Sequence, residues 1–214
     1  MKNNDNGAPT YGWDAITETF ESIYPGQTDP LHYRPIISYM LGGNDPLEGV
    51  SVYDGGDFWH FVTYGFSNLY ENEDENEDAQ WSGSGFELTL KLKKIPSVVL
   101  SETEDLEIKN IVGVLQGLAR YVFSSGKGFY PYEYIYTKQE NGFDAHQQSK
   151  LTGFATLPDI AGTIDTPNGK VEFVCIVGLT DKELKSIYEG KQTIREILEL
   201  LNSDLTDYSR EDVI

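Results

Sequence analysis

Hydrophobic side chains recur at helical spacing in two long parts of the chain. The clearest stripe runs through residues 108–122, where apolar positions repeat every three or four residues and so line one side of a helix. A similar stripe over 12–24 predicts an amphipathic helix. We expect that helix to stop at Pro25, because the residue before a proline is driven out of the α region.

Capping signals place the remaining helices. Ser101 with Glu104 forms a capping box ahead of the longest stripe, and Thr180 with Glu183 forms a second one. In such a box the hydroxyl and the carboxylate each accept a hydrogen bond from an otherwise unpaired backbone N–H. The second box opens a helix predicted to end at about Tyr188. After Gly190, apolar residues along one side predict a last helix over 193–202.

Alternating and continuous apolar runs predict the strands. Residues 50–53 and 58–64 are two strands joined by the turn-forming residues 54–57. The alternation over 86–93 is strict, so its apolar members share one buried face. These members are Phe86, Leu88, Leu90 and Leu92. Further strands are predicted at 132–136, 151–157 and 171–177.

Helices and strands are interleaved without a regular βαβ period. This order predicts a mixed α/β (α+β) fold, in which helices pack on a mixed β-sheet. Residues 25–35 contain three prolines and read as an irregular connection, and 34–41 reads as a short helix closed by two glycines. We expect one domain, with the following limits: a mobile N-terminus at 1–10, the domain at 11–203, and a mobile C-terminus at 204–214.

Charge narrows the choice of partners. The chain has 16 basic and 35 acidic residues, a net charge of −19, which disfavours nucleic acids and anionic membranes as partners. Residues 1–90 hold two basic and 16 acidic residues, for a net charge of −14. Six carboxylates fall in eight residues, so 71–80 is predicted to be a solvated, mobile loop. Electrostatic attraction of a basic partner is the functional alternative, and a calcium site fits less well. The six are Glu71, Glu73, Asp74, Glu75, Glu77 and Asp78.

The sequence offers little for catalysis. Its three histidines are not at metal-binding spacing, and no nucleophile-elbow, phosphate-loop or dinucleotide-binding pattern occurs. His60 lies in an aromatic strand and is predicted to be a packed core histidine. Cys175 lies in an apolar strand and is predicted to be buried and unreactive. We therefore expect no catalytic residue, no metal site and no cofactor, and a binding protein rather than an enzyme. A single cysteine, no apolar run long enough to span a membrane and a polar N-terminus predict a cytoplasmic protein.

Several short blocks, in a fixed order over roughly residues 11–200, resemble the suppressor of fused (Sufu) domain. The blocks are Tyr-Pro-Gly-Gln at 24–27, Leu-Gly-Gly-Asn-Asp-Pro-Leu-Glu-Gly-Val-Ser-Val-Tyr at 41–53, Trp-His-Phe-Val-Thr-Tyr-Gly-Phe-Ser-Asn-Leu-Tyr at 59–70, Ser-Gly-Phe-Glu-Leu-Thr at 84–89, Leu-Gln-Gly-Leu-Ala-Arg-Tyr-Val-Phe at 115–123 and Thr-Pro-Asn-Gly-Lys-Val-Glu-Phe at 166–173. Each block is weak alone, and together they are specific. The resemblance implies a single Sufu-like α/β domain that binds proteins.

The resemblance also implies a function and two contact residues. Stand-alone bacterial members of the family are thought to act as antitoxins or immunity proteins of polymorphic or LXG-type toxins, many of which are nucleases. The implied partner is a toxin with a basic C-terminal domain, and we expect the protein to be a monomer or a heterodimer with that toxin. In the animal proteins the partner peptide contacts a tyrosine matching Tyr121 and an acidic residue matching Glu133. The flanks of Glu133 differ from the family pattern, and the second domain that completes the animal cleft has no counterpart here.

Two other functions stay open at this point. One is a regulatory or scaffolding interaction without a toxin, and the other is an enzyme whose site carries no recognisable motif. Packing rather than binding is the alternative role for Tyr121.

Overall fold

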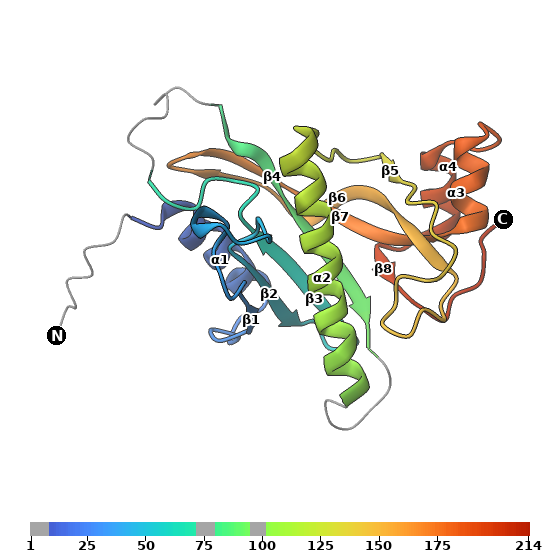
Figure 1. Ribbon diagram of the computed structural model, residues 1–214, viewed down its shortest axis with the longest axis horizontal. Helices are drawn as coiled ribbons and strands as arrows, with labels where there is room; N and C mark the ends of the chain where they lie inside the picture. The colour runs from blue at the N-terminus through green and yellow to red at the C-terminus, as the bar shows by residue number, and fades with distance from the viewer. Residues whose placement is uncertain (1–8, 72–79, 95–101) are drawn as a thin grey trace.

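The described strands form one twisted sheet. The computed structural model describes residues 9–71, 80–94 and 102–214. Within these residues eight strands pair in the order β1-β2-β3-β4-β7-β6-β5, and β8 extends the sheet beside β4 (Figure 1). Only the β4–β7 and β4–β8 pairings are parallel among those described, so the sheet is mixed as predicted. The strands are β1 (Leu31–Tyr33), β2 (Gly49–Asp54), β3 (Phe58–Tyr64), β4 (Trp81–Lys93), β5 (Tyr134–Ile135), β6 (Leu151–Thr166), β7 (Gly169–Thr180) and β8 (Leu205–Thr206).

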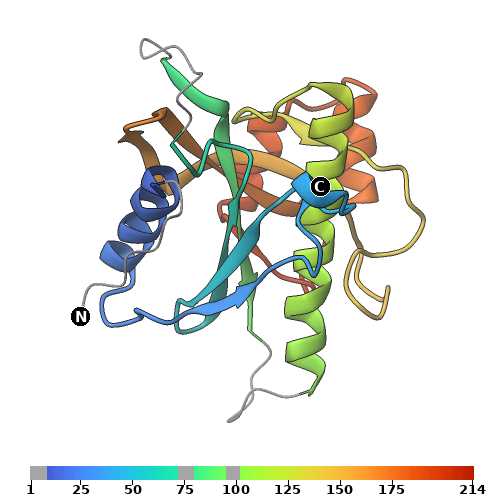
Figure 2. The same cartoon turned by 60° about the vertical axis from the view of Figure 1, so that its left-hand side comes forward.

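The two long helices cover opposite faces of the sheet. Helix α2 (Glu102–Ser125) lies on one face and α1 (Tyr11–Ile23) on the other, as Figure 2 shows. Successive side chains of a strand point to opposite faces, so β3 contributes Phe61 to the core under α2 and Val62 to the core under α1. The central strands are therefore buried on both faces.

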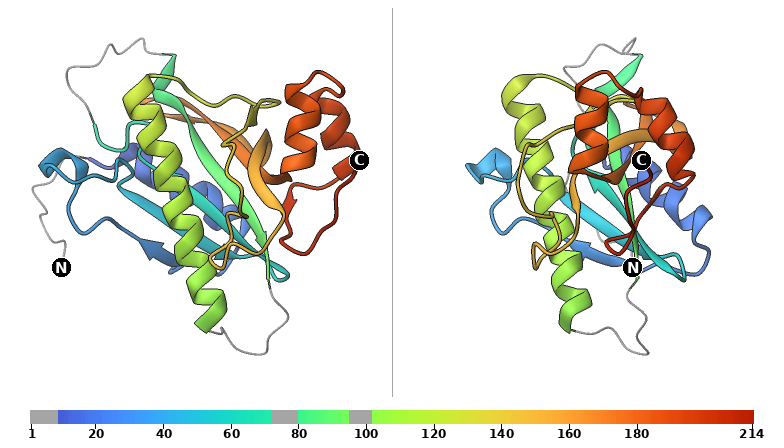
Figure 3. Two further views of the ribbon diagram at one scale, coloured as in Figure 1. Left: turned by 45° about the vertical axis from the view of Figure 1, so that its right-hand side comes forward. Right: turned by 90° about the vertical axis from the view of Figure 1, so that its right-hand side faces the viewer.

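The C-terminal helices form a third cluster. Helices α3 (Asp181–Tyr188) and α4 (Ile194–Leu201) pack together over β6 and β7 at the end of the molecule that holds the C-terminus (Figure 3). Both begin with a complete capping box, one of them the predicted box of Thr180 and Glu183. Burial of Leu184 and Ile197 fixes the two helices to the sheet.

The chain after α4 returns to the domain. Strand β8 pairs with β4, and the guanidinium of Arg210 donates to both carboxylate oxygens of Glu183, at 2.7 and 2.6 Å. The backbone N–H of Val213 also donates to Glu183. The sequence predicts mobility for residues 204–214, whereas the structure places this segment in contact with the sheet and with α3.

Several element boundaries differ from those predicted. Only Tyr39–Leu41 of the expected 34–41 helix is helical, as a 3₁₀ turn. Pro35 accounts for the first residue alone, because it keeps Arg34 out of the α region. The connection at 25–35 contains the short edge strand β1. Strands β4, β6 and β7 are longer than predicted, and β5 is shorter. The capping residue Ser101 lies outside the described residues.

Candidate functional site

Tyr121 and Glu133 line one surface hollow, although twelve positions separate them in the sequence. The hollow, which we call the Tyr121 hollow, encloses about 460 Å³. Helix α2 supplies Tyr121, the loop after α2 supplies Glu133, and α3 and α4 supply Ile187 and Ile194. Its other lining residues are Lys127, Gly128, Phe129, Tyr132 and Tyr134.

Local hydrogen bonds hold Glu133 in this position. Its backbone N–H donates to Thr156 Oγ1 at 2.7 Å, and its carboxylate accepts from the backbone N–H of Tyr130 at 3.1 Å. The hydroxyl of Thr156 in turn donates to the carbonyl of Tyr130 at 2.6 Å. The loop is thus fixed to β6, while the carboxylate itself stays exposed to solvent.

Exposed tyrosines surround this acid. Tyr121 stacks on Phe129 with 6.0 Å between ring centroids, yet 46% of Tyr121 is exposed. The guanidinium of Arg195 lies 3.5 Å from the ring centroid of Tyr132. Tyrosine combines a large apolar ring with a hydroxyl and has few rotatable bonds, which makes it well suited to protein contacts. The exposed tyrosines of this region are Tyr121, Tyr130, Tyr132 and Tyr134.

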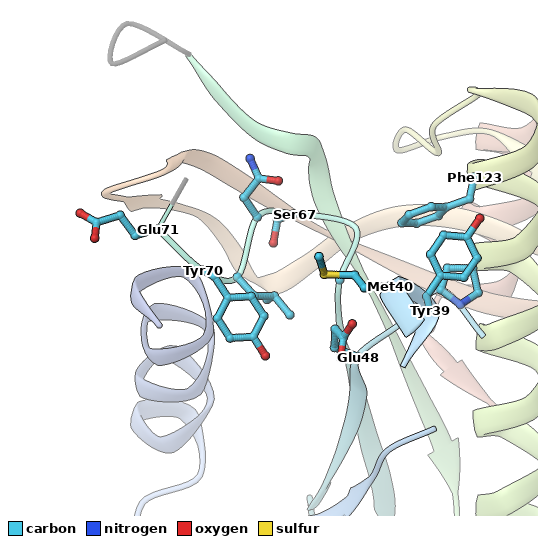
Figure 4. Close-up of a pocket in the computed structure, with 11 residues that line it drawn as sticks. Tyr39, Met40, Glu48, Ser67, Tyr70, Glu71 and Phe123 are labelled. Atoms are coloured by element: carbon cyan, nitrogen blue, oxygen red, sulfur yellow. The ribbon is translucent and has the colours of Figure 1, made fainter. Parts of the chain in front are cut away.

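A second hollow, which we call the Met40 hollow, is lined by Phe123 near the C-terminal end of α2. It encloses about 390 Å³. In Figure 4, Tyr39 and Phe123 stand at one end, Tyr70 lies toward the other, and Glu48 lies below Met40 in this view. Its other lining residues are Pro46, Gly65, Ser67, Asn68, Leu69 and Glu71.

A third, smaller hollow connects the two. It shares Phe123 with the Met40 hollow and Gly128 with the Tyr121 hollow. Shallow depressions lined by aromatic side chains therefore follow one another around the C-terminal end of α2. Such a series fits an extended surface for a macromolecule better than a single deep ligand pocket.

A buried polar cluster around His60 is closed to substrates. His60 Nε2 lies 3.1 Å from Asp159 Oδ2, and Tyr24 Oη lies 2.7 Å from His60 Nδ1. His60 and Asp159 have fully buried side chains, and Thr89 donates a further hydrogen bond to Asp159 at 2.8 Å. Contact with His60 holds the pKa of Asp159 below its usual value despite burial. This arrangement ties α1, β3, β4 and β6 together, and it confirms His60 as a hydrogen-bonded core residue.

Cys175 is fully buried, as predicted. Burial raises the pKa of its thiol strongly, and the nearby carboxylates of Asp159 and Asp204 raise it further. A thiol that resists ionisation is a poor nucleophile. Among the described residues, no group of three or more potential ligands could hold a metal ion. None of the described helices has the length and apolar character needed to cross a bilayer.

The structure groups only some of the residues that the sequence singled out. Tyr121 and Glu133 come together, whereas Glu71 lines the Met40 hollow. Glu73, Asp74, Glu75, Glu77 and Asp78 lie outside the described residues. Sequence reasoning missed Met40 and Glu48, because 34–41 reads as a short helix and Glu48 stood out only as one member of a family block. The exposed apolar run at 36–41 was the signal that could have pointed to them.

Comparison with known proteins identifies the family. A family model described as Suppressor of fused protein (SUFU) matches residues 43–211. The chain belongs to the Suppressor of fused family. It is 33% identical over 205 residues to the Suppressor of fused homologs of Homo sapiens and of Mus musculus, which covers 90% of this chain and 40% of each relative. The chain thus spans less than half the length of these curated relatives.

Solved structures of Suppressor of fused share the fold. The crystal structure of the Sufu–Fu complex contains a chain that matches with a TM-score of 0.78 and 30% identity, covering 95% of this chain and 92% of that one. Drosophila Suppressor of fused also matches with a TM-score of 0.78, at 29% identity, covering 99% of this chain and 53% of that one. The expected Sufu-like domain with a mixed sheet is therefore confirmed.

Proposed function

We propose that this chain is a protein-binding domain that neutralises a cognate toxin by direct contact, as an antitoxin or immunity protein. The observation that carries protein binding is the group of exposed tyrosines around Glu133 at the end of α2. Membership of the Suppressor of fused family supports a protein partner, since a similar chain was crystallised in a Sufu–Fu complex.

The charge of the chain supports the toxin as partner. A nuclease domain carries basic residues that grip phosphates, and a protein with a net charge of −19 complements that surface. The acidic residues Glu71, Glu73, Asp74, Glu75, Glu77 and Asp78 act in this proposal by attracting the basic domain, and Tyr121 and Glu133 by direct contact. A regulatory or scaffolding interaction is the second candidate, and the similar Sufu–Fu complex favours it.

Co-expression with the product of the adjacent gene tests the proposal. We expect that product to be toxic alone, and to be captured and neutralised by the full chain. A double variant, Tyr121→Ala with Glu133→Gln, should weaken capture by tenfold or more, on the order of the effect of central aromatic residues in interfaces. Tyr11→Ala with Glu199→Gln is the matched control, because both residues are exposed and lie on other helices. A non-toxic neighbour that still binds through Tyr121 would favour the regulatory function instead.

Salt dependence separates attraction from contact. Replacing the six carboxylates of 71–78 by amides should slow association at low ionic strength and leave dissociation nearly unchanged. Glu133→Gln should instead speed dissociation, and the effect should persist in high salt. Association that responds to neither salt nor the six-fold change would assign the acidic segment to solubility.

A further inference from the structure

A short loop beside the Met40 hollow exposes unusually large apolar side chains. Met40 is 86% exposed and Leu41 82%, and Ile36 is fully exposed. Apolar side chains are common on surfaces one at a time, whereas several in one loop mark an interaction site.

The loop is held in its conformation by contacts on its inner side. The Ser38 hydroxyl donates to Glu48 Oε1 at 3.0 Å, and the Ser38 carbonyl accepts from the backbone N–H groups of Leu41 and Gly43. The ring of Tyr39 meets that of Phe123 edge to face at 5.6 Å. A binding surface that is preformed loses less conformational entropy when a partner binds.

The floor of the hollow is equally well fixed. Glu87 is fully buried beneath it and accepts hydrogen bonds from the backbone N–H groups of Gly65 and Ser67, at 3.0 and 2.9 Å. Both donors belong to the segment that lines the hollow. The hollow is therefore supported from below by one side chain of β4.

The described lining of the hollow carries charge of one sign. Its charged members are Glu48 and Glu71, and no lysine or arginine is among the described residues that line it. Among the described residues neither carboxylate forms an ion pair with a basic group. Figure 4 shows Glu48 within the hollow and Glu71 at its outer edge. Apolar walls around an unneutralised carboxylate complement an aliphatic or aromatic side chain next to a lysine or arginine.

Other occupants fit this chemistry less well. A second copy placed here symmetrically would bring the same carboxylates toward each other, and like charges in a partly desolvated interface are repulsive. Residues 72–79 of the chain itself are acidic and include no lysine or arginine that could pair with Glu48.

We propose that the Met40 hollow is a second docking site, which takes a short segment of a partner protein with an apolar residue directly beside an arginine or lysine. The proposal goes beyond the Tyr121 hollow and does not require the partner to be a toxin. The apolar side chain packs among Met40, Tyr39 and Phe123, and the cation pairs with Glu48.

Fluorescence polarisation with short labelled peptides tests the site on the full chain. The probe is a mixture of the pattern Gly-Xaa-Xaa-Leu-Arg-Xaa-Xaa-Gly, in which Xaa is alanine, serine or asparagine. We expect it to bind, and the mixtures with Leu-Glu or Ser-Arg at the centre to bind about tenfold more weakly, a loss typical of a central interface contact. Met40→Ser and Glu48→Gln should each weaken binding several-fold.

Matched controls keep the result interpretable. Ile160→Ser removes an exposed apolar residue on β6, and Glu199→Gln an exposed carboxylate on α4; neither should change binding. Met40 is too exposed for its loss to unfold the domain, which a thermal melt verifies. Equal binding of all three peptide mixtures, or equal binding to Met40→Ser and to the unchanged chain, would refute the proposal.

Three further results would also overturn it. One is the absence of peptide binding at any attainable concentration. Another is a dimer in sedimentation experiments that Met40→Ser dissociates, which would make a second copy the occupant. The third is peptide binding only after removal of residues 1–8, which would make the chain's own N-terminus the occupant. If the chain binds the peptide but does not neutralise the product of the adjacent gene, the proposed function is wrong and the docking site stands.

Discussion

Glu87 in strand β4 and Glu183 at the start of α3 are both fully buried, yet their partners differ in charge. The carboxylate of Glu183 accepts hydrogen bonds from both terminal nitrogens of Arg210, at 2.7 and 2.6 Å. Among the described residues, Glu87 accepts hydrogen bonds from uncharged donors alone: the hydroxyls of Thr63 and Ser67, each at 2.6 Å, and two backbone N–H groups. The same type of side chain is therefore an ion-pair partner in one place and is held by uncharged donors in the other.

The difference has a physical basis in how each charge is compensated. A buried carboxylate is strongly disfavoured unless an opposite charge or several hydrogen bonds stabilise it. At Glu87, loss of hydration outweighs the hydrogen bonds from Ser67 and Thr63 and raises the pKa to about 7. At Glu183 a bidentate arginine supplies the opposite charge, and so the carboxylate anchors the C-terminal segment to α3.

Removal of Arg210 should have the largest effect on stability. Arg210→Ala leaves the Glu183 carboxylate buried without its counter-charge, which typically costs about 3–5 kcal/mol. We expect the free energy of unfolding in urea to fall by this order. Residues near Arg210 should also lose protection in amide hydrogen exchange, because Arg210 joins this segment to α3.

A second ion pair of the same segment provides the control. Lys150 pairs with Glu211, and both side chains are largely exposed. Lys150→Ala should therefore change stability by less than about 1 kcal/mol. Equal effects of the two substitutions would mean that burial does not distinguish these pairs.

Part of this comparison could be read from the sequence, and part could not. The capping box of Thr180 and Glu183 was predicted because its signal is local. Its link to Arg210 spans 27 positions and joins a segment expected to be mobile, so no local pattern reports it. Long-range pairing therefore determines the position of residues 204–214, and such pairing leaves no local signal in the sequence.

The burial of Glu87 was missed for a related reason. Strict alternation in β4 indicated one buried face, through Phe86 and its apolar companions. The structure buries both faces, because β4 lies between β3 and β7 and is covered on both sides by helices. A single strand's pattern does not show what packs on its polar side. Likewise, Tyr121 and Glu133 were named through the family resemblance, and only the fold shows that they line one hollow.

The charge state of Glu87 should make stability depend on pH. The folded carboxyl keeps its proton up to about pH 7, whereas the unfolded one ionises near its ordinary pKa of 4.5. The folded state thus binds more protons between these values, and stability falls as pH rises through the window. The full difference is on the order of 3 kcal/mol. Urea unfolding at several values between about pH 5 and pH 8 measures it.

Glu87→Gln isolates this contribution. Glutamine imitates the protonated acid in shape and cannot ionise, so the variant should lack the fall and should be at least as stable as the unchanged chain above pH 7. Burial lowers the pKa of His32, so this histidine makes stability rise with pH, opposite to the effect of Glu87. The contribution of His32 is the same in the variant and in the unchanged chain. The difference between the two pH profiles is therefore the quantity to compare. Parallel profiles would show that Glu87 does not titrate in this range.

Two capping boxes that differ in burial extend the comparison to hydrogen bonds without an ion pair. Thr193 Oγ1 accepts from the backbone N–H of Glu196 at 3.2 Å, in the same arrangement as Thr180 with Glu183. The box at Thr193 is exposed, whereas Thr180 is only 1% exposed. Thr193→Ala should cost about 1 kcal/mol, the usual loss for a helix cap, since water replaces the lost acceptor. Thr180→Ala should cost closer to 2 kcal/mol, the upper end for a cap, because a buried N–H is left without an acceptor.

Urea unfolding measures the loss of stability in each of the two variants. For Thr193→Ala, hydrogen exchange should show that the loss of protection is confined to α4. If Thr180→Ala costs no more than Thr193→Ala, the ion pair with Arg210 holds Glu183 in place without help from its cap.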